Sequence, residues 1–331
     1  MVLMNKKYII KNYTDLANPI LGTKIISYSD EFFAPAKRII NPLKPIFKEN
    51  IFDSHGKWMD GWETRRRRSP GFDFVIIKLG KPGKIKTVDI DTSFFNGNQP
   101  EYAQLEGCYS NNDNIKNIKW AKIIKKQKIK PNSSNLFKSQ NSKTFTHIKL
   151  NIFPDGGVAR LRLFGNIDLS LHKFSKNKNI DLANIVNGSE ILACSDEHFG
   201  NANNLILPGK SINMGNGWET RRRRGKGFDW VLIKLGYPGT IDYFEIGTHF
   251  FKGNYPDNFS IQAFNNNKKF SITSLIKNSN KWVTLISNHK LKANSNIRIK
   301  NTKYMNKNFN FIKLNIYPDG GISRFRVFGK V

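Results

Sequence analysis

Short apolar segments recur along the chain, and none keeps a helical period over three turns. The clearest lie at residues 74–79, 85–90, 147–152 and 160–164. Short segments of this kind, rich in Val, Ile, Leu and Phe, predict β-strands. Between them, residues 81–83 (KPG), 237–239 (YPG) and 154–157 (PDGG) are typical turn sequences. We therefore expect an all-β protein built from antiparallel strands.

The sequence contains an internal repeat. Residues 61–68 (GWETRRRR) recur unchanged at 217–224, and flanking segments recur in the same order. The further matches are 15–18 with 181–184, 29–31 with 195–197, 78–80 with 234–236, 91–98 with 247–254, and 151–157 with 315–321. A repeat of this length is a whole domain, far longer than the unit of a solenoid. The sequence predicts two tandem β-sandwich domains, 15–166 and 181–331, joined by a polar linker at 167–180.

The copies differ in loop length. In the first copy Gly61 lies 31 positions after Asp30, whereas in the second Gly217 lies 21 positions after Asp196. Loops absorb such insertions at little cost in stability. We expect the two copies to share one architecture and to differ in the connections between strands.

The two arginine runs are the strongest chemical signal, because they hold 8 of the 14 arginines. On a strand Glu63, Arg65 and Arg67 share one face, and on a helix Glu63 meets Arg67 one turn later. Either conformation predicts a carboxylate–guanidinium pair. The arginines could bind an anionic ligand or tie strands to acidic residues of the fold, and the sequence leaves both readings open. Trp62 and Trp218 are expected in the core.

A second motif sets the copies apart, because His249 stands where the first copy has Ser93. His249 is the only histidine within a repeated motif, which makes it a candidate acid or base. Asn98 and Asn254 follow glycines in the same motif, as turn residues or as amide partners of a ligand.

A third motif is the turn that precedes the last predicted strand of each copy. Arg160 and Arg324 each follow a Pro-Asp-Gly-Gly sequence. Such a turn needs no function to explain it, but binding residues often lie at loop ends. Both arginines are therefore candidate ligand-binding residues.

Composition narrows the function class. The net charge is +29, yet the 40 lysines are scattered and we expect no nucleic-acid partner. No apolar run exceeds four residues, so no membrane span is expected, and the first 22 residues lack a signal-peptide pattern. Cys108 and Cys194 stand alone, and the six histidines show no metal-binding spacing. We expect a cytoplasmic protein with no metal and no cofactor.

The repeated motifs together resemble the allantoicase family. The resemblance rests on GWETRRRR, residues 229–236, the motif at 91–98, and the segments 151–157 and 315–321, and it spans both copies. It implies two jelly-roll sandwiches of the galactose-binding type and a homo-oligomer. It also implies hydrolysis of allantoate to ureidoglycolate and urea.

Allantoate carries a carboxylate and two ureido groups, so its site needs a cation, amide partners and a proton donor. Nearby guanidinium groups would lower the pKa of Glu63 and Glu219, which suits a base or an orienting group. His249 is then the more plausible acid. The carboxylate-binding candidates are Arg65, Arg67, Arg221 and Arg223. The alternative function is a tandem module that binds a sugar or an acidic ligand without catalysis.

Overall fold

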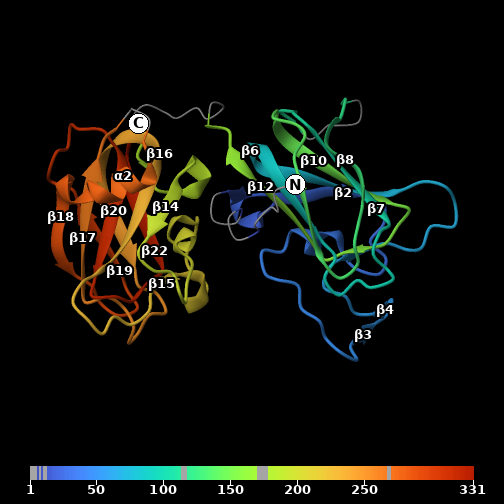
Figure 1. Cartoon of the computed structure of the whole chain (residues 1–331), viewed down its shortest axis with the longest axis horizontal. Helices are drawn as coiled ribbons and strands as arrows, with labels where there is room; N and C mark the ends of the chain where they lie inside the picture. Colours follow the sequence, from blue (N-terminus) through green and yellow to red (C-terminus); the bar gives the residue numbers. More distant parts are fainter. Residues whose placement is uncertain (1–5, 7–8, 10–12, 113–117, 170–177, 267–269) are drawn as a thin grey trace. The chain divides into compact units, whose positions relative to one another are not determined.

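The computed structural model describes residues 6, 9, 13–112, 118–169, 178–266 and 270–331 (Figure 1). The chain divides into two compact units, residues 1–171 and 172–331, which we call the first and second repeat. The division falls within the predicted linker, 167–180. Residues 170–177 of that linker lie outside the described residues.

The described strands of the first repeat form one eight-stranded antiparallel sheet system and two small ribbons. Its order is β1 (Thr14–Asp15), β12 (Arg160–Ile167), β6 (Asp73–Asp91), β10 (Thr144–Phe153), β7 (Tyr102–Cys108) and β8 (Ala121–Lys128), with β2 (Lys24–Tyr28) and β9 (Ser134–Lys138) also paired to β6. The ribbons join β5 (Trp62–Glu63) to β11 (Gly157–Val158), and β3 (Phe52–Asp53) to β4 (Gly56–Lys57). The 3-10 helices are η1 (Pro19–Leu21) and η2 (Ala36–Ile40).

The second repeat follows the same order. Its strands are β13 (Ile180–Asp181), β22 (Arg324–Lys330), β16 (Asp229–Gly247), β20 (Phe309–Tyr317), β17 (Asn258–Phe264) and β18 (Val283–Lys290), with β14 (Glu190–Cys194) and β19 (Asn296–Lys300) on β16 and the ribbon β15 (Trp218–Glu219) with β21 (Gly321–Ile322). Its helices are η4 (Ile185–Asn187), η5 (Ala202–Ile206), η6 (Met214–Asn216), α2 (Ile272–Lys277) and η7 (Ser279–Lys281). The expected all-β architecture of two tandem sandwiches is confirmed.

One long strand connects the layers of each sandwich. Residues 73–78 of β6 pair with β2 and β10, and residues 83–91 pair with β9 and β12. The predicted turns at 81–83 and 237–239 are therefore wrong, because both segments lie inside continuous strands. Pro82 is tolerated because it falls where the register with β10 shifts, so no ladder bond needs its missing N–H.

The core lies between the layers. Val75, Ile77, Ile148 and Leu150 are fully buried, whereas Phe74, Lys78 and Lys149 beside them are more exposed, as expected for side chains on opposite faces of a strand. Trp62 and Trp218 are fully buried, which confirms their expected place in the core. The one described α-helix that the strand pattern did not predict is α2, whose Leu275 packs with Trp282, Phe311 and Leu232.

Candidate functional site

The GWETRRRR run begins in the sheet and then leaves it. Trp62 and Glu63 form β5, and residues 64–68 continue in neither strand nor helix. The indole N–H of Trp62 donates to the carbonyl of Asp30 at 2.8 Å, and Trp218 makes the same 2.8 Å bond to Asp196. The buried tryptophan therefore ties the arginine run to the Ser-Asp-Glu motif that precedes it in each repeat.

The carboxylate of that aspartate holds the first arginine. Arg65 donates its backbone N–H to Asp30 Oδ2 at 2.7 Å and its Nη2 to Oδ1 at 2.8 Å. Arg221 repeats the arrangement on Asp196, at 2.7 Å and 3.2 Å. Desolvation raises the pKa of Asp30, but the hydrogen bonds from Arg65 outweigh it and leave the pKa below its usual value.

The third arginine is held from two directions. Arg67 Nη1 pairs with the buried Asp73 at 2.8 Å, and its backbone N–H donates to Asp155 at 2.7 Å. The guanidinium lies over Gly71, where a Cβ would come within 2.9 Å of Nη2. Gly71 also has a φ of +147°, so only glycine suits this position. Arg223 makes the equivalent bonds to Asp229 and Asp319, at 2.5 Å and 2.8 Å.

The glutamate of the run pairs with an asparagine. The side-chain amide of Asn98 donates to Glu63 Oε1 at 2.7 Å, and Asn254 donates to Glu219 Oε1 at 2.5 Å. The expected pair of Glu63 with Arg67 is wrong, because Asp73 and Asp155 hold that arginine. Burial raises the pKa of Glu63, and the bond from Asn98 offsets this only in part. The predicted lowering of that pKa is therefore also wrong.

Known proteins resemble this chain over nearly its whole length. The model of the allantoicase repeat matches residues 14–168 and 180–331. The chain is 46% identical to a probable allantoicase of Acinetobacter baylyi over 97% of this chain and 96% of the relative, and 45% identical to one of Pseudomonas fluorescens over 97% of each. The crystal structure of the allantoicase of Saccharomyces cerevisiae superposes with a TM-score of 0.79 at 35% identity, covering 98% of this chain and 96% of that one.

The chain belongs to the allantoicase family.

In this family member the fold leaves the other arginines of each run free. Arg66 and Arg68 are exposed, and within the described residues neither makes an ion pair or a hydrogen bond. Arg222 and Arg224 repeat this in the second repeat. The sequence prediction missed Arg66 and Arg68 because it chose the arginines on the same strand face as Glu63. The same alternation places Arg66 and Arg68 on the opposite face, and it could have indicated them as candidates.

Arg160 and Arg324 anchor loops and, among the described residues, make no hydrogen bond to the Glu–Asn pairs. Arg160 is almost fully buried and donates to Leu43 O at 3.0 Å, Asp60 O at 2.8 Å and Asp60 Oδ2 at 2.7 Å. Arg324 makes the corresponding bonds to Gly209 O and to the carbonyl and side chain of Asn216. Desolvation lowers the pKa of Arg324 to about 10.

His249 and Ser93 occupy equivalent positions with different partners. The N–H of Ser93 donates to Asp91 Oδ1 at 2.8 Å, whereas the N–H of His249 donates to Ser323 Oγ at 3.1 Å. The His249 side chain is half-buried, and no hydrogen bond joins its imidazole to any described residue. The imidazole of His249 therefore makes no hydrogen bond to Glu219 or Asn254 in the described part of the chain.

No group of three or more His, Cys, Asp and Glu in the described chain is arranged to hold a metal ion. Cys108 and Cys194, both among the described residues, form no disulfide, and burial raises the pKa of Cys108 to about 11. Within the described residues, no helix has the length and apolar character to cross a membrane.

Proposed function

We propose that this chain hydrolyses allantoate to ureidoglycolate and urea. The observation that carries the proposal is membership of the allantoicase family over nearly the whole chain, together with the Glu–Asn pair that both repeats keep beside the arginine run. Both repeats keep the same polar arrangement, which supports a role in binding a ligand as well as a role in the fold.

The reaction requires one proton to leave water and one to reach the departing nitrogen. A bond forms between the central carbon of allantoate and the water oxygen, and the bond from that carbon to one ureido nitrogen breaks. The water proton goes to a base, and the departing urea nitrogen takes a proton from an acid. The site must therefore place a proton-transfer group on each side of the central carbon.

Glu63 and Glu219 are our candidates for this transfer. A carboxyl whose pKa is raised by burial exchanges protons more readily near neutral pH, and Glu63 is such a group. Asn98 orients Glu63 through its amide N–H, which leaves its carbonyl oxygen to accept from a ureido N–H. Asn254 does the same beside Glu219. His249 is the candidate proton donor of the second repeat.

We assign the substrate carboxylate to the arginines that the fold leaves free. Arg66 and Arg68, with Arg222 and Arg224, supply exposed guanidinium groups without a carboxylate partner in the described residues. Arg65 and Arg67, with their counterparts Arg221 and Arg223, fix the path of the run through Asp30, Asp73 and the matching aspartates of the second repeat. Arg160 and Arg324 act as loop anchors outside the site.

The direct test is turnover. Purified chain incubated with allantoate should release urea and ureidoglycolate in equal amounts. Arg66→Ala should raise KM, because it removes a carboxylate contact without disturbing an ion pair of the fold. Arg67→Ala should lower stability as well as activity, since it leaves the buried Asp73 without its cation. Saturable binding of allantoate without release of urea would instead identify a tandem binding module.

We further infer that the chain acts as a cytoplasmic homo-oligomer without a nucleic-acid partner, as the family resemblance and the scattered lysines support. Light scattering of the purified chain measures the oligomeric state, and cell fractionation measures the location. Retention of DNA or RNA at about 50 mM salt, lost steeply as salt rises, would contradict the absence of a nucleic-acid partner.

A further inference from the structure

The longer loop of the first repeat is a fixed structure. It runs from Asn41 to Asp60 and includes the β3–β4 hairpin, which extends away from the sheets in Figure 1. Arg160 donates to Leu43 O near its start and to Asp60 at its end. Asp60 Oδ2 also accepts from the backbone N–H of Ile46 at 3.0 Å. A buried guanidinium thus closes the loop and holds its two arms in place.

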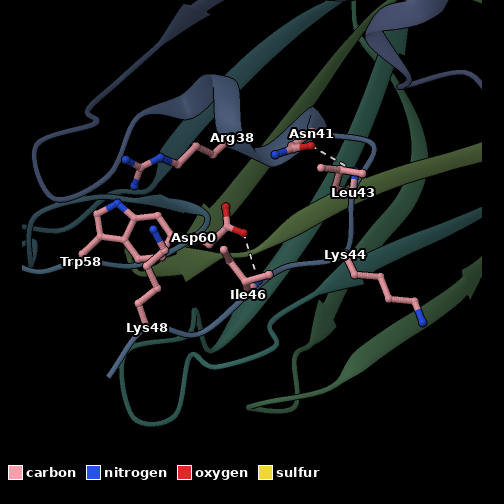
Figure 2. A pocket seen from close by; sticks show the side chains of 8 residues that line it. All are labelled: Arg38, Asn41, Leu43, Lys44, Ile46, Lys48, Trp58 and Asp60. Carbon is pink, nitrogen blue, oxygen red and sulfur yellow. Dashed lines mark hydrogen bonds between the residues drawn. The ribbon is translucent and has the colours of Figure 1, made fainter. Parts of the chain in front are cut away.

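This loop and η2 line a cavity of about 310 Å³ that is open to solvent (Figure 2). Trp58 forms one wall, with the Arg38 guanidinium carbon and the Lys48 Nζ each 5.1 Å from the centre of its ring. Figure 2 shows both side chains turned toward Trp58, whereas Lys44 points away. Arg38 is further fixed by its Nη1, which donates to Met59 O at 2.6 Å.

Two cations held on one ring repel each other, and the ring offsets that repulsion only in part. The carboxylate among the residues that line this cavity is Asp60, and its charge is already balanced by Arg160 at 2.7 Å. A second hollow of about 520 Å³ shares Arg38 and adds Lys24 and Lys37, with no acidic residue in its lining. Among the described residues, neither Arg38 nor Lys48 forms an ion pair with a carboxylate.

The second repeat offers no match. Its corresponding loop, residues 207–216, contains one lysine and no aromatic residue. The cavity is consequently not part of the duplicated arrangement of glutamate, asparagine and arginine. Whatever occupies it serves the first repeat alone.

We propose that this cavity binds a small oxyanion, a carboxylate or a phosphate, through Arg38 and Lys48. The guanidinium of Arg38 supplies planar donors, and Lys48 adds a mobile charge that can move from the ring to the anion. Trp58 and the carbonyl of Met59 hold Arg38 in place before the anion arrives, which reduces the ordering needed on binding.

The test is calorimetric titration of the full chain with inorganic phosphate and, separately, with malonate. Sodium chloride keeps the ionic strength constant, so that screening is equal in both arms. We expect one saturable site per chain that depends on Lys48, apart from any carboxylate binding at the exposed arginines of the two runs, and the tighter arm at that site identifies phosphate or carboxylate as the natural group. Lys48→Met should weaken binding about tenfold or more through loss of a charged hydrogen bond. Trp58→Phe should abolish any change of tryptophan fluorescence that the anion causes.

Lys125→Met is the matched control, because Lys125 is an exposed lysine on β8 of the same repeat. This variant removes the same charge at a residue that does not line the cavity, and binding should stay within about twofold of the parent. Equal weakening by Lys125→Met and Lys48→Met would overturn the proposal in favour of diffuse attraction. Absence of saturable binding in both arms would overturn it as well. Neither outcome depends on turnover of allantoate.

Discussion

The two repeats share most of the contacts around the arginine run and differ in a few. Both bury a tryptophan, both hold the first and third arginines on aspartates, and both pair the glutamate with an asparagine. They differ at the position of Ser93 and His249. In the first repeat Asp91 accepts the backbone N–H of Ser93, and in the second Ser323 takes over that task for His249.

This difference shows what is free to change. Gly247 stands in the second repeat where the first has Asp91. A Cβ at Gly247 would lie 2.8 Å from Ser323 Oγ, so the loss of the aspartate side chain makes room for the serine that replaces it as acceptor. Since Ser323 satisfies the backbone, the imidazole of His249 is not needed for the fold at that point. The shared contacts define the common site, and the changed ones give the second repeat a titratable group that the first lacks.

The largest effect should follow from removing both glutamates. Glu63→Gln with Glu219→Gln should lower kcat about 10²- to 10⁴-fold, because an amide cannot transfer a proton. If both repeats catalyse the reaction at equal rates, each single variant should keep about half of the activity, because one of two equal sites remains. Steady-state rates of urea release measure this. Glu190→Gln, on the exposed Glu190, is the matched control.

Full loss from one single variant would show that only that repeat catalyses the reaction.

Next come the two loop anchors. Arg160→Met should cost about 3 to 5 kcal/mol of unfolding free energy, because it leaves the carboxylate of Asp60 without its cation. Arg324→Met should cost about 1 to 3 kcal/mol, since its partners are carbonyls and an amide. Urea unfolding followed by tryptophan fluorescence compares them. Equal costs would contradict a special role for Asp60.

A smaller effect is expected at the position where the repeats differ. In a Glu63→Gln background, where the second repeat works alone, His249→Asn should lower kcat about 10²-fold, the lower end for an acid, because asparagine can still hydrogen-bond the leaving nitrogen. In a Glu219→Gln background, Ser93→Ala should leave kcat unchanged.

Melting temperatures of the same variants separate catalysis from stability. A lower melting temperature with unchanged kcat for His249→Asn would remove the acid role and leave a structural one.

The smallest effect concerns pH. Burial raises the pKa of Asp181 to about 6, against the pull of Arg326, and burial also raises the pKa of its counterpart Asp15. The folded state then favours the protonated carboxyl, so this group's contribution to stability is lost as pH rises from about 4 to about 6. Asp181→Asn should remove that loss, worth roughly 2 kcal/mol.

Urea unfolding of parent and variant at both ends of that pH range gives the difference. A gap between the two proteins that does not change with pH would contradict the raised pKa.

Much of the fold could be predicted from local patterns. The strands predicted at 74–79, 85–90, 147–152 and 160–164 lie within β6, β10 and β12. They could be predicted because short apolar segments are a local property of the sequence. The turn predicted at 81–83 failed for a tertiary reason. Pro82 interrupts one ladder where the strand passes between layers, and the chain continues extended because its other half pairs elsewhere.

The sequence by itself determined the duplication, the β architecture, the buried tryptophans and the residue types of the site, since these follow from identity and periodicity. Tertiary structure decided which groups pair. Asp30 and Asn98 each lie 35 residues from their partners Arg65 and Glu63. No spacing rule connects such residues, because the sheet and not the local chain brings them together. That long-range pairing separates Glu63 from the arginines and leaves Arg66 and Arg68 free, while burial in the folded chain raises the pKa of Glu63.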